Sequence, residues 1–303
     1  VGPDAAAKAQ ALQPGEILLL ENLRFNPGET ANDADFARAL ASFGDTYVND
    51  AFGTAHRAHA STVGVTNHMP ESRAGLLMAK ELDNLGALLD EPDRPFVAVL
   101  GGAKVSGKVE VILNLLDRVD TLLLGGGMIF TFFREHGLGI GRSLYDEKSA
   151  EVVREIQARA KGSRARLVLP EDCVVADEFA DSARQQKVLV TDIGAGWMGL
   201  DIGPKTVARY AEIIGGARSI FWNGPMGVFE MPSFAAGTRA VGEAVAQATD
   251  RGARSVVGGG DSVAAINQLG LAARISHIST GGGASLEFMA GRVLPGVAAL
   301  TDA

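Results

Sequence analysis

Three glycine triplets constrain the fold of this chain more than any other feature of its sequence. Each follows a short apolar run, in LLLGGGM (122–128), VVGGGDSVAAI (256–266) and ISTGGGAS (278–285). A glycine directly after a strand lets the backbone turn sharply and lets a ligand approach the main chain. A helix that starts there directs its unpaired N–H groups and the positive end of its dipole toward the same place. The triplets are therefore typical of strand-to-helix turns that bind an anion such as phosphate.

Apolar runs alternate with helical patterns through most of the chain. Between two such runs, KVEVILNLLDRV (108–119) places its apolar residues along one helical stripe. Near-continuous apolar strands that alternate with helices predict a parallel sheet covered on both faces, with ligands bound beyond the carboxyl ends of the strands. The candidate strands are FVAVL (96–100), TLLL (121–124), RLVL (166–169), SIFW (219–222), SVV (255–257) and ISHIS (275–279).

A smaller α/β pattern precedes these strands. It consists of a strand EILLL (16–20), a helix over about 33–43 and a strand TYVND (46–50). Segment 72–90 predicts a further helix, because Ser72 can cap it and the apolar residues from Met78 to Leu89 form one stripe. We therefore predict an α/β protein of two lobes, with a partial N-terminal lobe (1–71), an interdomain helix or hinge (72–90) and a second lobe (91–303).

Composition argues against several functional classes. The net charge is −8 over 303 residues, whereas a nucleic-acid-binding protein normally has a basic face. The single cysteine, Cys173, allows no intramolecular disulfide, and the five histidines show no zinc-like spacing. No apolar run reaches the length of a membrane span. Neither GxxxxGKS/T nor a GxGxxG that opens a βαβ unit is present, so the common P-loop and dinucleotide-binding interpretations are unsupported.

Charged residues accompany the glycine turns. If a helix begins near Lys104 in LGGAKVSGKVEV (100–111), then Lys104 and Lys108 lie one turn apart and suit a polyphosphate. The alternative is two solvated surface lysines. Asp261 in GGGDS cannot contact phosphate favourably by itself, so it looks like a ligand of phosphate-bound Mg²⁺. The alternative is that Asp261 caps the helix that starts near Ser262.

Eight stretches spread over nearly the whole chain belong to one pattern: LLLENLRFNPGE (18–29), YVNDAFGTAHRAHAST (47–62), LGGAKVSGK (100–108), LLLGGGMIFTF (122–132), GLDIGPKT (199–206), FWNGPMGVFE (221–230), VVGGGDS (256–262) and HISTGGGASLEFMAGRVLPGV (277–297). Taken together, these stretches are similar to motifs of phosphoglycerate kinases, and they run in that family's order. The resemblance implies two α/β lobes, of which the first binds 3-phosphoglycerate or 1,3-bisphosphoglycerate and the second binds Mg-ATP or Mg-ADP. It also implies a monomeric, cytoplasmic, glycolytic enzyme that transfers the phosphoryl group directly and in line.

The resemblance also implies roles for single residues. Arg24, Arg57 and His56 match residues that bind the triose phosphate, since guanidinium groups suit phosphate and carboxylate oxygens. Alternatives are a salt bridge from Arg24 to Glu21 or Glu29, and structural roles for His56 and His59. Nucleotide-binding positions are Lys104, Lys108, Gly125, Gly126, Gly127, Asn223, Glu230, Gly259, Gly260, Asp261 and Ser262, with Asp261 also the metal ligand. The positions implied to be catalytic are Lys108, Gly281, Gly282 and Gly283.

One departure from the family qualifies this interpretation. The family's chains begin well before the first residue here, and that earlier segment contributes to the N-terminal lobe and its basic patch. We therefore expect nucleotide binding to survive, acceptor binding to be impaired and residues 1–70 to expose sheet edges and apolar surface. The ending LPGVAALTDA (294–303) should pack on the N-terminal lobe. The rival functions are a non-catalytic nucleotide-binding fragment and, less well supported, a nicotinamide-dependent oxidoreductase.

Overall fold

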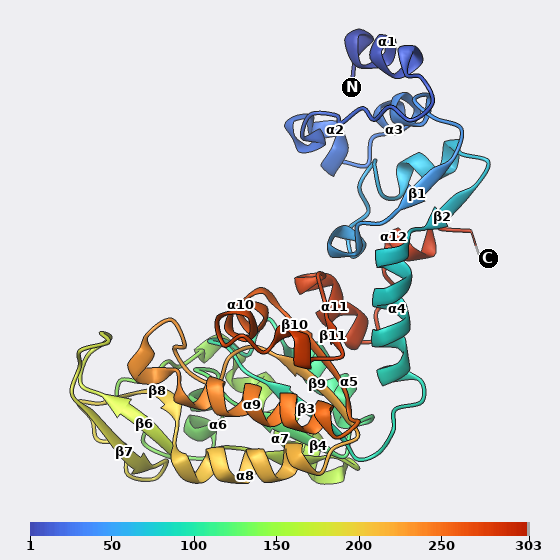
Figure 1. Ribbon diagram of the computed structural model, residues 1–303. Coiled ribbons are helices and arrows are strands. Elements are labelled where there is room, and N and C mark those ends of the chain that lie inside the picture. Colours follow the sequence, from blue (N-terminus) through green and yellow to red (C-terminus); the bar gives the residue numbers. More distant parts are fainter. Residues whose placement is uncertain (302–303) are drawn as a thin grey trace. The chain divides into compact units, whose positions relative to one another are not determined.

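A computed structural model describes residues 1–301, which divide into two compact units. Unit 1 consists of Val1–Asp83 together with the C-terminal segment from Arg292, and unit 2 of Asn84–Gly291 (Figure 1). Helix α4 (Leu76–Leu89) runs from the first unit into the second. None of the described helices is both long enough and apolar enough to cross a membrane.

Unit 2 is built on a six-stranded sheet in which every pair of neighbours is parallel. The predicted parallel sheet is therefore confirmed, and each predicted strand of this part is found within a few residues of its expected bounds. In spatial order the strands are β11 (His277–Ile278), β10 (Arg254–Gly258), β9 (Ser219–Asn223), β3 (Phe96–Leu100), β4 (Thr121–Leu124) and β5 (Arg166–Val168).

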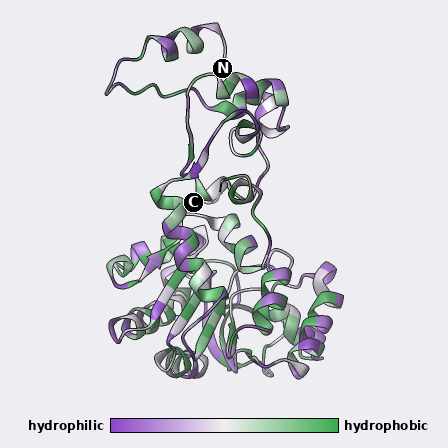
Figure 2. Ribbon diagram, turned by 90° about the vertical axis from the view of Figure 1, so that its right-hand side faces the viewer, coloured by the Kyte–Doolittle hydropathy of each residue, from purple (hydrophilic) through white to green (hydrophobic). Residues whose placement is uncertain are grey.

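Helices enclose this sheet. Side chains of a strand alternate between its faces. Val97, Val99, Ile220 and Trp222 all belong to the core that α8 (Pro204–Gly215) and α9 (Ala236–Asp250) complete. The intervening residues, such as Phe221, point to the other face. Figure 2 shows the strands of this unit as mostly hydrophobic. The helices are α5 (Val109–Leu116), α6 (Ile129–Glu135), α7 (Ala150–Gly162), α8 (Pro204–Gly215), α9 (Ala236–Asp250), α10 (Gly260–Gln268) and α11 (Gly282–Met289).

The order of the strands reverses between β3 and β9. From β3 the chain builds outward through β4 to β5, and it then returns to place β9 on the other side of β3 and to continue through β10 to β11. The loops that leave β3 and β9 therefore diverge and open a crevice at the carboxyl end of the sheet. This is the place where a doubly wound sheet binds its ligand.

A second, antiparallel sheet in unit 2 was not predicted. It contains β7 (Gln185–Leu189), β6 (Asp172–Ala176) and β8 (Met198–Ile202) in that spatial order. Its small core contains Val174, Leu200 and Phe234. A register irregularity at Val174/Val175 interrupts the pairing of β6 with β8. The end of β8 contributes to the crevice at the carboxyl end of the large sheet.

Unit 1 contains one parallel pair of strands, β1 (Tyr47–Asn49) and β2 (Ser72–Ala74). Phe36 and Ala37 on α3 form its core with Ala60. The helix predicted over 33–43 is confirmed in α3. The helices are α1 (Pro3–Ala11), α2 (Pro27–Thr30), α3 (Ala34–Ala41) and α12 (Pro295–Ala298), with 3-10 turns at η1 (Leu23–Phe25), η2 (Phe52–Thr54) and η3 (Gly64–His68).

Two predictions for this unit were wrong. EILLL (16–20) is not a strand: Ile17 and Leu19 are 93% and 91% exposed. A strand needs a hydrogen-bonded neighbour, and no described residue pairs with this segment. Nor does Ser72 cap a helix, because it pairs with Tyr47 in the β1–β2 ladder. Helix α4 starts at Leu76 instead, and Asp50 caps it from a distant part of the chain by accepting a hydrogen bond from Met78 N at 2.9 Å.

The C-terminal segment packs within unit 1. Gly296 N donates to Ala55 O at 2.8 Å, and Asn49 Nδ2 donates to Gly296 O at 3.3 Å. A Cβ at Gly296 would lie 3.0 Å from Ala55 Cα, so a larger residue would fit there only if the Ala55 backbone shifted. Thr301 N donates to Ser72 O at 2.8 Å. The segment thus holds the end of β1 and the loop that leads to His56.

Candidate active site

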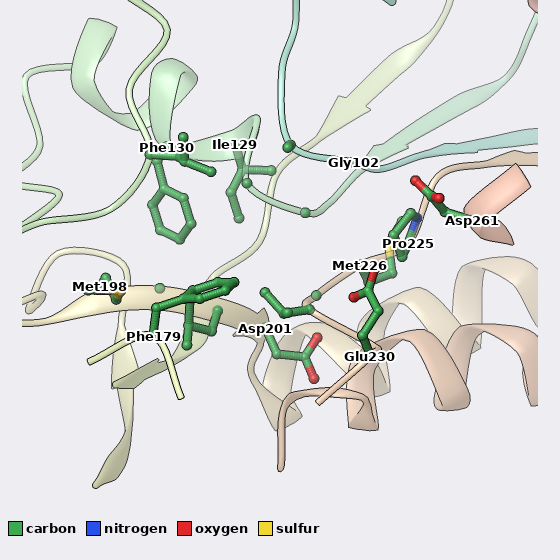
Figure 3. Close-up of a pocket in the computed structure, with 18 of the residues that line it drawn as sticks. Gly102, Ile129, Phe130, Phe179, Met198, Asp201, Pro225, Met226, Glu230 and Asp261 are labelled. Atoms are coloured by element: carbon green, nitrogen blue, oxygen red, sulfur yellow. The ribbon is translucent and has the colours of Figure 1, made fainter. Parts of the chain in front are cut away.

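The crevice at the carboxyl end of the large sheet holds a cavity of about 290 Å³ (Figure 3). Its walls come from the loops after β3, β4 and β9, the start of α10 and the end of β8. Four of the residues singled out in the sequence line it: Gly126, Gly127, Glu230 and Asp261. A cavity of this kind, with an apolar part and a few polar groups, is typical of a small-molecule site.

Bare backbone forms one wall of the cavity. Gly126 has φ +70°, and a Cβ there would lie 2.4 Å from Gly102 N. Gly125 lies beneath Met226, because its Cβ would be 2.4 Å from Met226 Sδ, and it does not line the cavity itself. Met128 N donates to Gly102 O at 3.0 Å. These contacts bring the loops after β3 and β4 together. They explain why the sequence has glycine at positions 125 and 126.

The other end of the cavity is apolar. Ile129, Phe130, Met198 and Leu200 line it, and Phe179 stands at its rim with 62% of its surface exposed. Gly199 lies against the Phe130 ring, since a Cβ there would be 1.9 Å from Phe130 Cζ. Figure 3 shows Phe130 and Phe179 on either side of the space. The resulting slot suits a flat aromatic group. Sequence reasoning missed these residues, although GMIFTF and GLDIGPKT contain three of them.

Lys108 lies in the polar part of the site. Its ammonium group donates a hydrogen bond to Asn223 Oδ1. Burial lowers the pKa of Lys108 to about 8, and the nearby Asp261 carboxylate partly opposes that effect. Lys104, by contrast, is exposed. The prediction that both lysines share a helical face was wrong, because α5 begins only at Val109, after a turn that Lys108 N closes by donating to Val105 O.

Asn223 is the most informative residue of the site. It is 2% exposed, and its Nδ2 has no hydrogen-bond acceptor among the described residues. Leaving a buried donor unpaired costs about 1–3 kcal/mol. The donor lies 2.8 Å from where a Cβ on Gly259 would stand, at the turn that leads into α10. Asn223 Nδ2 therefore needs an acceptor oxygen beside Lys108 and this turn.

The second glycine triplet forms the start of α10. Gly259 is the N-cap with φ +90°, Gly260 is the first helical residue, and Asp261 and Ser262 follow. Ser262 Oγ accepts a hydrogen bond from Gly224 N at 2.5 Å, which ties this turn to the loop after β9. Asp261 is exposed and lines the cavity. The unpaired amides at the start of the helix are suited to an anion.

The third triplet opens α11. Gly281 is the N-cap, Gly282 and Gly283 begin the helix, and Gly281 N donates to Ser279 Oγ at 3.1 Å. These residues do not line the cavity. Ser285, one turn on, lies at the end of β10, because a Cβ at Gly258 would be 2.8 Å from its Oγ. The starts of α10 and α11 thus both follow neighbouring strands at the same edge of the sheet.

The residues that could bind the triose phosphate lie in unit 1. Arg57 Nε donates to His56 Nε2 at 3.2 Å, which requires that this ring nitrogen carry no proton. Arg24 lies on η1 and is exposed. Neither Glu21 nor Glu29 forms an ion pair with it among the described residues.

Glu29 forms hydrogen bonds within unit 1 instead of an ion pair with Arg24. It is buried and accepts two hydrogen bonds from Ser61, from N at 3.0 Å and from Oγ at 2.6 Å. His59 Nδ1 lies 3.6 Å from Glu29 Oε1, and His59 is also buried. The structural interpretation of His59 fits this position. Burial, with a smaller effect of the Glu29 charge, raises the pKa of Tyr47 to about 12, and Tyr47 OH donates to Ser61 O at 2.8 Å.

Comparison with known proteins decides the family. The family model for phosphoglycerate kinase matches residues 1–292. The chain belongs to the phosphoglycerate kinase family. The phosphoglycerate kinase of Acaryochloris marina is 55% identical over 303 residues, covering 100% of this chain and 76% of the relative. That of Chloroflexus aurantiacus is 57% identical over 302 residues, covering 100% of this chain and 75% of the relative.

Solved phosphoglycerate kinases share the fold. The structure of the Coxiella burnetii enzyme has a TM-score of 0.89 at 42% identity, over 95% of this chain and 74% of that one. The Pyrococcus horikoshii enzyme has a TM-score of 0.85 at 35% identity, over 99% and 76%. The chain therefore spans about three-quarters of the length of these phosphoglycerate kinases. Members of the family are kinases that transfer phosphoryl groups in glycolysis and bind ATP or ADP and phosphoglycerates.

Proposed function

We propose that unit 2 binds Mg-ATP or Mg-ADP in its cavity, and that the protein transfers the γ-phosphoryl group directly to the carboxylate of 3-phosphoglycerate, or in reverse from 1,3-bisphosphoglycerate to ADP. The observation that carries this proposal is the buried, unpaired Asn223 Nδ2 beside Lys108 and the start of α10. A phosphate oxygen would satisfy that donor, and its negative charge would stabilise the buried Lys108 ammonium and raise the pKa of Lys108.

Each part of the cavity would hold a different part of the nucleotide. The apolar slot between Phe130 and Phe179 suits the base. The Glu230 carboxylate, on the loop after β9, can accept hydrogen bonds from the ribose hydroxyls. The glycine turns at Gly125–Gly127 and Gly259–Gly260 let the main chain approach the sugar and phosphates. Lys104 is exposed, so it would reach the phosphates only from the rim.

Asp261 would hold the magnesium ion. No group of three or more His, Cys, Asp or Glu residues gathers into a metal site anywhere in residues 1–301. A single exposed carboxylate at the cavity nevertheless fits Mg²⁺, which is commonly bound by one or two carboxylates plus substrate phosphates. The ion would neutralise charge on the phosphate oxygens. Asp261 itself also attracts the Lys108 ammonium and so favours its charged form.

Catalysis would depend on position and charge. The acceptor is a carboxylate and already a nucleophile, so the reaction needs no general base. Lys108 and the amides of Gly281, Gly282 and Gly283 would stabilise the charge on the transferred group. Arg24, Arg57 and His56 in unit 1 would bind the triose phosphate through their donor groups. Both ends of the transferred group would then face donors rather than water.

The domain boundaries remain part of this proposal. We assign residues 1–71 to the acceptor-binding lobe, 72–90 to a hinge that includes α4, and 91–303 to the nucleotide-binding lobe, with the final residues returning to the first. Closure of the lobes would exclude water from the phosphoryl group. We further propose that the enzyme acts as a monomer, and that it acts in the cytoplasm, as the glycolytic activity of the family suggests.

A second candidate is a nucleotide-binding chain without turnover. The observation that favours it is the almost complete exposure of Ile17 and Leu19 in unit 1, where a folded acceptor lobe would bury such side chains. In this case unit 2 would bind Mg-ADP normally, while unit 1 would bind 3-phosphoglycerate weakly or not at all.

A coupled assay distinguishes the two candidates. The 303-residue chain is mixed with Mg-ATP, and 3-phosphoglycerate-dependent ADP release is followed while a coupling enzyme removes the product. Lys108→Ala should abolish the rate, and Lys187→Ala, which removes an exposed lysine on β7, should not change it. No turnover by the unaltered chain at high enzyme concentration would reject the kinase proposal for this chain and leave the nucleotide-binding alternative.

A further inference from the structure

Asp201 is a buried carboxylate in the wall of the nucleotide cavity that the proposed mechanism does not use. It lies near the end of β8 and is 3% exposed. Its Oδ1 accepts a hydrogen bond from Ile202 N at 2.9 Å, and its Oδ2 accepts one from Gly237 N at 2.7 Å. The carboxylate therefore links β8 to the first turn of α9. A buried carboxylate with this arrangement requires an explanation, because burying its charge is unfavourable.

The chain packs tightly around this carboxylate. A Cβ at either Gly227 or Gly237 would lie 2.3 Å from Asp201 Oδ1, so both positions require glycine. These two glycines bracket the segment that carries Glu230. A further bond, from Val228 N to Leu200 O at 2.8 Å, joins the same segment to β8. Asp201 and Glu230 both line the cavity, and Figure 3 labels the two carboxylates.

We propose that Asp201 is a positioning residue for the reaction. By bridging β8 to the start of α9 it fixes the loop that presents Glu230, and it thereby sets the affinity for the nucleoside part of the substrate. This inference rests on the proposed function, because it assumes that a nucleotide occupies the cavity. Asp201 would touch no reacting atom, and its effect would pass entirely through the loop.

The protonation of Asp201 should modulate this bridge. Burial raises the pKa of Asp201 to about 7, against the opposing effect of the two amide hydrogen bonds. The ionised carboxylate accepts both bonds, whereas the protonated acid offers one good acceptor and a hydroxyl group. The loop should therefore be held less firmly below neutral pH, and nucleoside affinity should fall as the pH is lowered through 7.

Other charged groups nearby do not account for this behaviour. Asp172 on β6 accepts bonds from Lys205 N and Thr206 N at the start of α8. On α9, Arg239 is exposed and lines a different pocket. In the cavity, Glu230, Asp261 and Arg142 form no hydrogen bond or ion pair with Asp201 within residues 1–301. The two backbone amides are thus the groups that respond to its charge.

Adenosine is the probe that tests this proposal. It has the base and ribose that the loop would contact, and it carries no phosphate whose titration would overlap with that of Asp201. Asp201→Asn keeps the shape and one acceptor but cannot accept both amide bonds. We expect about tenfold weaker adenosine binding by calorimetry at pH 8, which corresponds to about 1.4 kcal/mol.

Asp172→Asn is the matched control. Asp172 is equally buried and also accepts two amide bonds, but it does not line the cavity. This variant should lose stability without losing adenosine affinity. If Asp172→Asn weakens binding as much as Asp201→Asn does, the effect is a general loss of structure and the proposal is overturned.

The pH dependence of adenosine binding to the unaltered chain is a second test, and it does not depend on whether a variant folds. The adenosine affinity of the unaltered chain should be about tenfold lower at pH 6 than at pH 8, because only the ionised fraction holds the loop and a pKa of about 7 reduces that fraction about tenfold over this range. The affinity of Asp201→Asn should stay constant. An affinity independent of pH in the unaltered chain would overturn the role of Asp201. Absence of any adenosine binding would instead reject the proposed nucleotide site, so the two failures are distinguishable.

Discussion

Replacing Lys108 with methionine should stabilise unit 2, although we expect the same change to abolish the proposed phosphoryl transfer. Burial lowers the pKa of Lys108 from 10.5 to about 8. Because one pKa unit corresponds to about 1.4 kcal/mol, keeping the buried ammonium charged at pH 7 costs roughly 3 kcal/mol. Methionine removes the charge and keeps an unbranched chain of similar length. The free energy of unfolding should rise accordingly.

One lost contact reduces this gain. Without Lys108, Asn223 Oδ1 has no donor, and an unsatisfied buried acceptor costs about 1–3 kcal/mol. The expected net increase in the free energy of unfolding at pH 7 is therefore roughly 0–2 kcal/mol. A stabilising change at a catalytic position is a known consequence of placing strained or desolvated charges in active sites.

The difference in stability between Lys108→Met and the unaltered protein should depend on pH. Below about pH 8 the native lysine is charged, and its burial reduces stability in full. Between about pH 8 and 10.5 the native state has lost the proton that the unfolded state still binds, so the stability of the unaltered protein rises with pH. The advantage of Lys108→Met should therefore shrink above pH 8 by about 1.4 kcal/mol per pH unit, disappear near pH 9 and be reversed at pH 10.

Tryptophan fluorescence provides the assay. Both tryptophans, Trp197 and Trp222, lie in unit 2, and Trp222 is fully buried, so urea unfolding monitored by their emission reports on this unit. Midpoints and slopes for the two proteins are compared at pH 7 and pH 10. A variant less stable than the unaltered protein at pH 7, or a difference that does not change with pH, would refute the reasoning about the buried charge.

Two further predictions concern a glycine and a carboxylate. Gly259→Ala should weaken Mg-ADP binding at least tenfold, because the new Cβ would lie 2.8 Å from Asn223 Nδ2 and the residue would be strained at φ +90°. The control is Gly252→Ala, which has φ +96° and open space around it and should reduce stability without changing the affinity. Equal Mg-ADP affinities of the two variants in calorimetry would contradict this prediction. Glu29→Ala should lower the free energy of unfolding of unit 1 by about 1–3 kcal/mol, because the change leaves Ser61 N and Oγ without their acceptor. Circular dichroism during urea unfolding measures this loss. An unchanged unfolding midpoint would contradict the structural role of Glu29.

The large sheet and its turns could be predicted from the sequence, because they follow from local pattern. FVAVL and SIFW are buried on both faces, so their residues are apolar throughout, and a glycine marks each turn where the backbone must come close to its neighbour. The same reasoning failed at EILLL (16–20). Its composition also suits a buried strand, but whether a neighbour is present is not a local property of the segment.

The missed features depend on contacts between distant segments. The antiparallel sheet was not predicted because β7 is mostly polar and exposed on one edge, so no apolar period identifies it. Asp50 caps α4 from outside the helix, which no local capping pattern reveals. Asp201 stood in the quoted GLDIGPKT stretch, yet only the fold shows that Gly237, on α9, approaches it. Asp261 was singled out from the sequence because it stands directly beside a glycine turn, whereas Asn223 was singled out only through the family resemblance.

Titration of the 303-residue chain with Mg-ADP is the measurement that tests the central claim most directly. We predict one site in unit 2, with affinity lowered at least tenfold by Asn223→Leu, which removes the buried unpaired donor together with the partner of Lys108. Asn267→Leu, on the far end of α10, is the control and should bind as the unaltered protein does. Saturable Mg-ADP binding that disappears only with Asn223→Leu would support the account. Absence of binding, or equal affinities in all three proteins, would contradict it.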